Sequence, residues 1–260
     1  MGLASKASFA PARPVGGLRP VSVAESTPNK GVKAVDISII IPTLNAGARL
    51  SSTIAALEEA RETLAVEIIV VDGGSSDDTR ARAEAAGAIV VDAPRGRGTQ
   101  LSAGAREASG RWLLFLHADT TLEPFWSTTI TSFMRGRGNA LKAAYFTFAL
   151  DDASNAARRV EVLANWRARK LGLPYGDQGL FMSRTKYNSL VGYLDLPIME
   201  DVDIVRRIGK RNLVELPATA TTSAERYRHG GFIMRPLRNL ALLALYFVGV
   251  PPKRLARLYG

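Results

Sequence analysis

Residues 112–119 read WLLFLHAD, in which five consecutive apolar side chains lead to His117, Ala118 and Asp119. An apolar run of this length predicts a strand that is buried on both faces, as in a parallel sheet. The carboxylate of Asp119 would then stand at the carboxyl end of the strand, where open α/β sheets bind their ligands. Asp119 is therefore a candidate ligand for a divalent cation on a diphosphate.

Strand and helix patterns alternate around this run from Ile37 onward. The predicted strands are 37–41, 67–71, 88–91, 112–116 and 143–150, and the predicted helices are 48–64, 77–86, 124–135 and 153–171. Such alternation is typical of βαβ units, although it becomes less strict after Asp119. We predict an α/β fold of Rossmann-like type in a single domain, with a mostly parallel central sheet flanked by helices.

The chain of 260 residues fits one large domain with a well-buried core. We expect a disordered basic tail over 1–35, the domain over 36–235, and an apolar and basic helical segment over 236–260. The tail is basic and rich in Pro, Gly, Ser and Ala, without apolar periodicity. A transit peptide is the alternative interpretation of these residues, whereas a secretory apolar core is missing.

The net charge of +10 favours anionic partners, and the absence of cysteine fits a reducing compartment. We therefore expect a cytoplasmic protein with a phosphorylated small molecule or an acidic membrane surface as its partner. Nucleic acid is not expected as a partner, because the basic residues are scattered and aromatic residues are not interleaved with them.

The segment Leu240–Val250 is almost wholly apolar, and basic residues flank it on both sides. It is too short to span a bilayer, which takes about 20 residues. A core helix is one interpretation, because a helix that is apolar all round is normally buried. The other is a helix lying on the inner face of an anionic membrane, which would bring the site to a lipid-linked acceptor.

Residues 70–79, VVDGGSSDDT, leave a strand through glycines and enter a helix. Asp72 at the strand end could accept hydrogen bonds from a base or a ribose. The alternative is a plain glycine turn followed by a helix N-cap. The segment is neither a P-loop nor a GxGxxG fingerprint.

Three further polar segments are candidate parts of the same site. The loop 94–100 carries Arg97 and Gln100, which could meet a diphosphate at a helix start. The turn 174–179 carries Asp177, and the segment 196–203 opens a helix with Glu200 and Asp201. Asp201 could take a proton from an acceptor hydroxyl, whereas the alternative assigns these acids to stabilising the helix dipole.

Together these motifs resemble the family 2 inverting glycosyltransferases of GT-A fold, from Asp36 to Gly260. The similarity rests on IIPTLN at 40–45, the turn at 72–79, HAD at 117–119 in place of Asp-x-Asp, and Glu200-Asp201. The chain is most similar to a bacterial single-domain subgroup, often called selenodomain-associated transferase 2. That similarity lies in LFLHADT at 114–120, GDQ at 176–178 and TSA at 222–224.

The resemblance implies that Asp72 contacts the nucleotide base, that Asp119 ligates Mg²⁺ or Mn²⁺ on the diphosphate, and that Asp201 is the general base. The expected donor-binding residues are Pro42, Asn45, Asp72, Arg97, Gln100 and His117, and the expected acceptor-side residues are Gly176, Asp177, Gln178 and Glu200. The chain departs from the family pattern at Ala46, Gly73 and His117, which leaves the donor open, although UDP is the commoner implication. His117 as polar filler at a strand end is the alternative to a ligand role.

Two other functions compete with sugar transfer. A nucleotidyltransferase could use a similar sheet and metal carboxylate, but no glycine-rich phosphate loop with a lysine follows the first strand. A basic nucleic-acid-binding protein is the non-enzymatic alternative, motivated by the net charge alone.

Overall fold

The computed structural model describes residues 34–259, so residues 1–33 of the predicted tail lie outside the described part. Its centre is an eight-stranded sheet with the order β3-β2-β1-β4-β7-β6-β8-β5. The strands are β1 (Ile37–Thr43), β2 (Val66–Asp72), β3 (Ile89–Asp92), β4 (Trp112–Phe115), β5 (Thr120–Leu122), β6 (Ala143–Leu150), β7 (Leu180–Ser183) and β8 (Leu213–Thr222).

The first half of the sheet is parallel and the second half is mixed. β1 pairs in parallel with β2 and β4, and β2 pairs in parallel with β3. β7 runs antiparallel to both β4 and β6, while β8 is parallel to β6 and antiparallel to β5. The predicted α/β fold is confirmed, and the antiparallel pairs begin where the strict alternation of the sequence ends.

The helices cover both faces of this sheet. They are α1 (Gly47–Ala55), α2 (Thr79–Ala85), α3 (Arg97–Glu107), α4 (Trp126–Arg135), α5 (Asn155–Leu171), α6 (Arg184–Ser189), α7 (Glu200–Ile208), α8 (Glu225–Gly230), α9 (Met234–Phe247) and α10 (Pro252–Tyr259). Short 3₁₀ turns are η1 (Glu58–Glu62), η2 (Asn139–Leu141), η3 (Gly176–Gln178) and η4 (Lys210–Asn212).

The helix predicted over 48–64 is divided into α1 and η1. The amide of Leu57 donates to the Ile54 carbonyl at 2.9 Å, which tightens the chain into a 3₁₀ turn. The turn then places Glu59, whose carboxylate accepts from the amides of Phe125 (2.9 Å) and Ser127 (3.0 Å). The break in the helix therefore supplies partners for the otherwise unpaired amides at the start of α4.

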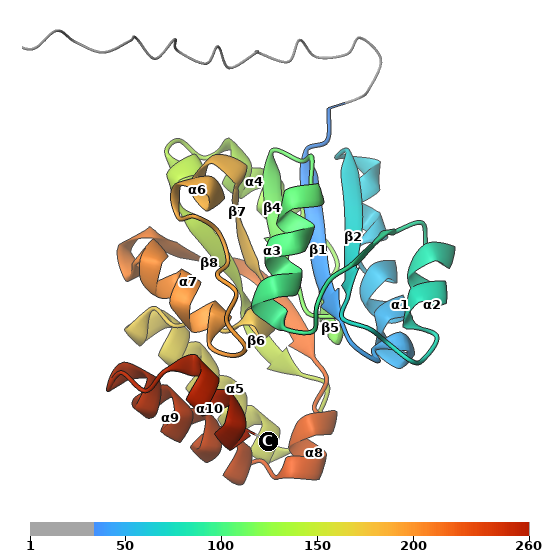
Figure 1. Ribbon diagram of the computed structural model, residues 1–260. Coiled ribbons are helices and arrows are strands. Elements are labelled where there is room, and N and C mark those ends of the chain that lie inside the picture. Colours follow the sequence, from blue (N-terminus) through green and yellow to red (C-terminus); the bar gives the residue numbers. More distant parts are fainter. Residues whose placement is uncertain (1–33, 260) are drawn as a thin grey trace, which may run out of the picture. The chain divides into compact units, whose positions relative to one another are not determined.

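Two apolar layers hold the helices on the sheet. One face packs β1 and β2 against α1 and α4, with the fully buried side chains of Ile39, Leu50 and Trp126 at its centre. The other face packs the same strands against α3 and α7, through residues such as Leu101 and Val205. Because β1, β2, β3 and β4 are parallel, their carboxyl ends lie together at one edge of the sheet (Figure 1).

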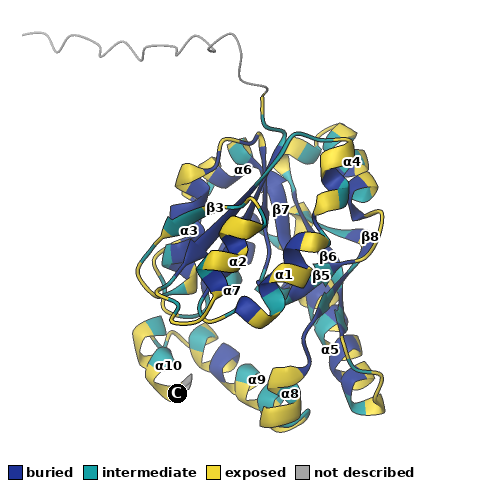
Figure 2. Ribbon diagram, turned by 90° about the vertical axis from the view of Figure 1, so that its right-hand side faces the viewer, coloured by how far each residue is buried: buried dark blue, intermediate teal, exposed yellow. Residues whose placement is uncertain are grey.

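The C-terminal helices α8, α9 and α10 lie with α5 beyond that edge of the sheet (Figure 1). Of α9, Leu242 and Leu243 are buried, whereas Leu237 and Leu240 are 54% and 60% exposed. Figure 2 shows how much of α8–α10 is exposed. The core-helix interpretation thus describes only one side of α9. None of the helices in the described part has the length and hydropathy required of a membrane span.

Candidate active site

Asp72 ends β2 with a buried side chain. Its carboxylate accepts hydrogen bonds from the amides of Gly74 (3.1 Å) and Ser75 (2.9 Å) and from the Thr43 hydroxyl (3.2 Å). Burial alone would raise the pKa of Asp72, but the hydrogen bonds from Ser75, Gly74 and Thr43 outweigh it and hold the pKa below its usual value. Asp72 is therefore a charged group that shapes its own turn.

The turn after β2 is joined to the loop after β1. Asn45, with φ of 51°, accepts from the Ser76 amide at 2.8 Å through Oδ1, and its own amide donates to Ser75 Oγ at 2.9 Å. Pro42 is buried in β1 opposite Val71. These contacts fix the predicted donor-side loop to the sheet edge.

Gln100 of α3 connects this loop region to the sheet through its side-chain amide. Its amide nitrogen donates to the carbonyls of Thr43 (2.7 Å) and Val71 (2.8 Å), which joins α3 to β1 and β2. A Cβ at Gly73 would approach the Gln100 amide to 3.1 Å. The geometry suits a positioning role for Gln100, with the nearby Arg97 exposed at the start of α3.

Asp119 lies in the loop between β4 and β5, half-buried. The backbone around it is held by Thr53, which donates to the Ala118 carbonyl at 2.9 Å, and by the Ser223 amide, which donates to the Asp119 carbonyl at 3.1 Å. Its carboxylate lies 3.7 Å from Arg226 Nη2 of α8. The predicted cation ligand thus already faces a positive group.

His117 packs against the turn that precedes β7. A Cβ built on Gly176 would lie 2.5 Å from His117 Nε2, so a side chain at that position would force the imidazole ring to move. Desolvation lowers the pKa of His117 to about 3, with Arg97 and Arg226 acting in the same direction. The imidazole is neutral at physiological pH.

Asp201 connects the start of α7 to the same turn. Its Oδ2 accepts from the Gly176 amide at 3.0 Å and its Oδ1 accepts from the Val202 amide at 2.7 Å. The preceding Met199 has a left-handed φ of 65°, which turns the chain sharply into the helix. Asp201 is half-buried and lines a small cavity with Tyr175 and Val205.

Two neighbouring acids titrate at unusually high pH. Burial raises the pKa of Asp177 to about 6, and the charges of Asp201 and Asp119 add to that increase. Burial and Asp201 raise the pKa of Glu200 to about 7. Among the described residues Asp177 Oδ1 is buried without a hydrogen-bond partner. Perturbed carboxyls of this kind cluster at functional sites.

The predicted residues therefore come together in two groups. One group is connected by the Gly176–Asp201 hydrogen bond, by the packing of Gly176 against His117 and by the charges of Asp119 and Asp201 on Asp177, and Glu200 joins it beside Asp201. The charge of Arg97 acts on His117, Asp177 and Glu200. The second group lies at the carboxyl ends of β1 and β2 and consists of Pro42, Asn45, Asp72 and Gln100. Gln178 is buried and donates to the Phe146 carbonyl at 3.1 Å, so it anchors the turn.

Two arginines of the site were not among the residues predicted from the sequence. Arg226 pairs with Asp119, and Arg167 of α5 lies with its guanidinium carbon 3.3 Å from the centre of the Tyr175 ring. Arg167 also donates to the Leu173 carbonyl at 2.9 Å. The TSA motif at 222–224, directly before α8, is the signal that could have indicated Arg226.

The family model for glycosyl transferase family 2 matches residues 38–188, which is more than half of the chain. The chain belongs to glycosyl transferase family 2. It is a transferase with an α/β fold of GT-A type, as the motifs predicted. Membership of the selenodomain-associated subgroup stays a prediction, and neither nucleotidyl transfer nor nucleic-acid binding is the assignment this family supports.

The individual relatives match shorter regions. Glucosyl-3-phosphoglycerate synthase of Mycobacterium tuberculosis (strain CDC 1551 / Oshkosh) is 35% identical over 92 residues, 32% of this chain and 28% of the relative. A PGL/p-HBAD biosynthesis glycosyltransferase of Mycobacterium bovis (strain BCG / Pasteur 1173P2) is 39% identical over 93 residues, 33% of this chain and 36% of the relative. The chain thus matches about a third of the length of these relatives.

Solved structures share the fold over more of the chain. The M. tuberculosis glucosyl-3-phosphoglycerate synthase in complex with Mn²⁺ and UDP-glucose superimposes with a TM-score of 0.56 at 22% identity, covering 84% of this chain and 80% of that chain. The complex of the same enzyme with Mn²⁺, UDP and glucosyl-3-phosphoglycerate gives a TM-score of 0.55 at 21% identity, covering 84% and 81%. This likeness establishes the common fold.

The raised pKa of Glu200 predicts a pH-dependent stability. Because its folded-state pKa of about 7 lies above the ordinary value of 4.5, the folded chain holds this proton more tightly than the unfolded chain. The free energy of unfolding therefore loses this contribution as the pH rises from about 4.5 to 7. We expect Glu200→Gln to gain about 1–3 kcal/mol relative to wild type across that window, measured by urea unfolding without metal.

The matched control is Glu123→Gln, which changes an exposed acid on the loop before α4. Glu200→Gln is compared with this variant at each pH. A pH-independent difference for Glu200→Gln would show that Glu200 does not hold a proton in the folded state.

Proposed function

We propose that the chain transfers a sugar from UDP to an acceptor hydroxyl with inversion, with Asp201 as the general base and Asp119 as the cation ligand. The supporting observation is the convergence of Asp119 and Asp201 on the buried carboxyl of Asp177, whose pKa both of them raise. Two carboxylates from distant parts of the sequence thus act on the same buried carboxyl.

The donor would lie at the carboxyl ends of β1 and β2, against the second group of residues. Asp72 holds the turn that would receive the nucleotide, and the amides at the start of α3 with Arg97 favour an anionic diphosphate. Arg226 adds a second guanidinium beside Asp119. UDP as the nucleotide is supported by the solved structures of the mycobacterial relative, which hold UDP-glucose or UDP.

The residues present fit a divalent cation that is shared with the donor. Within residues 34–259 no group of three His, Cys, Asp or Glu side chains is placed to hold a metal ion on its own. Mg²⁺ in particular is commonly bound by one or two carboxylates together with substrate phosphates and water. Asp119 would be the protein ligand, and the cation would neutralise the charge that develops on the leaving diphosphate.

The step itself needs one base. The acceptor oxygen forms a bond to the anomeric carbon as the bond from that carbon to the diphosphate oxygen breaks, and UDP leaves with the electron pair. Asp201 takes the proton of the hydroxyl, and its two hydrogen bonds from Gly176 and Val202 fix its direction. No second nucleophilic carboxylate is required, since the attack inverts the anomeric centre directly.

Asp201→Asn tests the base. The substitution keeps the shape of the side chain but removes the proton acceptor, so we expect transfer to fall by roughly 100- to 10,000-fold while UDP-sugar affinity stays near wild type. Binding is measured by calorimetry and transfer by UDP release. Asp203→Asn on the same helix is the control, and near wild-type turnover in Asp201→Asn would refute the assignment.

Asp119→Ala tests the cation ligand. Without this carboxylate, we expect the affinity for UDP-sugar in the presence of Mn²⁺ to drop by roughly tenfold or more, with little change in its absence. Asp92→Ala provides the control, because Asp92 ends the parallel strand β3 and its side chain is exposed. Equal Mn²⁺ dependence in Asp119→Ala and wild type would contradict the role.

We also propose that the C-terminal helices contact an anionic membrane on the cytoplasmic side, where the enzyme would reach a lipid-linked acceptor. Met234, Val248 and Leu258 are exposed apolar residues of this region. Lys253 and Arg254 are exposed on α10, the helix that also carries Leu258. An apolar surface bordered by basic side chains is typical of peripheral membrane binding.

Vesicle sedimentation tests this contact. Replacing Lys253 and Arg254 by Ser should weaken binding to vesicles containing phosphatidylserine by roughly 30-fold, since each basic residue contributes about 1 kcal/mol near such a surface. The control replaces the exposed Arg135 and Arg137 by Ser, which changes the net charge equally at the far end of α4. Equal effects of both pairs, or no sedimentation of the wild type, would exclude the contact.

A further inference from the structure

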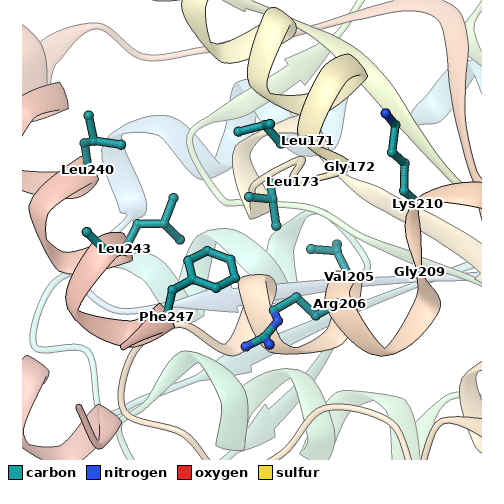
Figure 3. Close-up of a pocket in the computed structure, with 11 residues that line it drawn as sticks. Leu171, Gly172, Leu173, Val205, Arg206, Gly209, Lys210, Leu240, Leu243 and Phe247 are labelled. Carbon is teal, nitrogen blue, oxygen red and sulfur yellow. The ribbon is translucent and has the colours of Figure 1, made fainter. Parts of the chain in front are cut away.

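An apolar groove lies between α5, α7 and α9, outside the groups assigned to the reaction. Its volume is about 510 Å³, within the range of roughly 300–1,000 Å³ that is usual for small-molecule sites. Figure 3 shows Leu240, Leu243 and Phe247 of α9 on one side, with Leu171 and Leu173 opposite them. Val205 and Arg206 of α7 form the third wall (Figure 3).

This groove adjoins the cavity that contains the base. Val205 lines both the apolar groove and the small cavity at Asp201. The chain also passes from one to the other, because Leu173 lines the groove and the next residues, Pro174 and Tyr175, line the cavity. The groove and the cavity at Asp201 are therefore neighbours with a common wall at Val205.

The groove is open, because its apolar walls are not closed by core packing. Leu240, Phe247 and Leu171 are 60%, 47% and 51% exposed, although each contributes to the lining. Apolar side chains left exposed in a concave surface indicate a ligand or an interaction site.

The charged groups of the groove lie along its edge. The Arg206 guanidinium carbon is 4.8 Å from the centre of the Phe247 ring, and Lys210 Nζ donates to the Lys170 carbonyl at 2.7 Å. Arg206 follows Val205 on α7 and Lys210 begins the next turn, η4, so both cations come after Val205 in the chain, whereas Asp201 lies at the start of α7. The hydroxyl end of a ligand would thus face the base, and the far end of the groove would face anionic head groups.

We propose that this groove holds the hydrocarbon chain of the acceptor, an amphiphile whose hydroxyl group lies at Asp201. The inference rests on the proposed function and gives the acceptor its chemical class. The hydroxyl oxygen bonds to the anomeric carbon, UDP leaves, and Asp201 takes the proton, while the chain stays between α5, α7 and α9. The exposed side of the groove, at Leu240 and Phe247, would make it accessible from a membrane surface that the C-terminal helices would contact.

Binding of a chain can be measured without the donor. The probe is decyl glucoside below its micelle concentration, titrated calorimetrically into the full chain, with methyl glucoside as the ligand that has the same head group and no chain. We expect decyl glucoside to bind and methyl glucoside to show no binding at the same concentrations. Failure of decyl glucoside to bind would overturn the proposal.

Two substitutions on one helix locate the binding. Leu240→Glu places a charge in the groove and should weaken decyl glucoside binding by roughly tenfold or more. Leu237→Glu places the same charge at a similarly exposed position of α9 that does not line the groove, and it should leave the affinity within about twofold. Equal losses would assign the binding to the outer surface of α9 and overturn the proposal.

Light scattering on the same samples tests for a second copy of the chain as the occupant. A wild-type dimer that dissociates in Leu240→Glu but not in Leu237→Glu would assign the groove to the dimer interface and overturn the proposal. A monomer in all three proteins, together with the expected calorimetric pattern, supports the acceptor chain.

Turnover separates this inference from the proposed function. With UDP-glucose and Mn²⁺, decyl glucoside should accelerate UDP release and methyl glucoside should not, and Asp201→Asn should lose the acceleration while still binding decyl glucoside. If phosphoglyceric acid accelerates UDP release and decyl glucoside does not, the proposed function stands and the groove proposal falls. If no UDP-sugar binds although decyl glucoside binding is intact, the proposed function falls and the groove remains a binding site only.

Discussion

The hydrogen bond from the Gly176 amide to Asp201 Oδ2, 3.0 Å long, is the contact on which the acceptor side of the site depends. It joins the turn before β7 to the start of α7, two segments that pack on the same face of the sheet but are far apart in the sequence. Gly176 also lies against the His117 ring, which a side chain at this position would displace. A shift of this turn would therefore change the position of Asp201 relative to both β4 and Asp119.

The electrostatics of the site show what this arrangement demands. Asp177 and Glu200 are surrounded by protein beside Asp201, so burial and like charge raise the pKa of both carboxyls, to about 6 and about 7. Arg97 lowers both pKa values, which partly offsets the repulsion. Further positive charge would also lower the pKa of Asp177 and Glu200. A site with several neighbouring carboxyls therefore favours a cation that accompanies an anionic donor. Binding and stability are in this way coupled through the same carboxyls.

The sequence predicted the residues whose position follows from local pattern. Asp119 was identified because an apolar strand runs directly into it, and Asp72 because glycines follow it at a strand end. Arg226 was missed, since its proximity to Asp119 depends on β5 pairing with β8 across about a hundred residues. Gln100 was predicted to bind the donor, but its amide faces two backbone carbonyls that only the packing of α3 reveals. Tertiary contacts of this kind leave no periodic signal.

The apolar C-terminal segment shows why composition alone could not choose between a core helix and a surface helix. Leu243 is buried against the layer formed by α3 and α7, so α9 does take part in the core. Leu240, three residues earlier, is exposed and lines the groove beside it. A helix with apolar residues on every side can thus pack on the domain through one side and present the others to a second apolar phase. The groove lies where these two sides meet, and Val205 in its wall also lines the cavity at Asp201. The buried side of α9 therefore fixes the helix on the domain, and the exposed side forms one wall of a groove next to the proposed base.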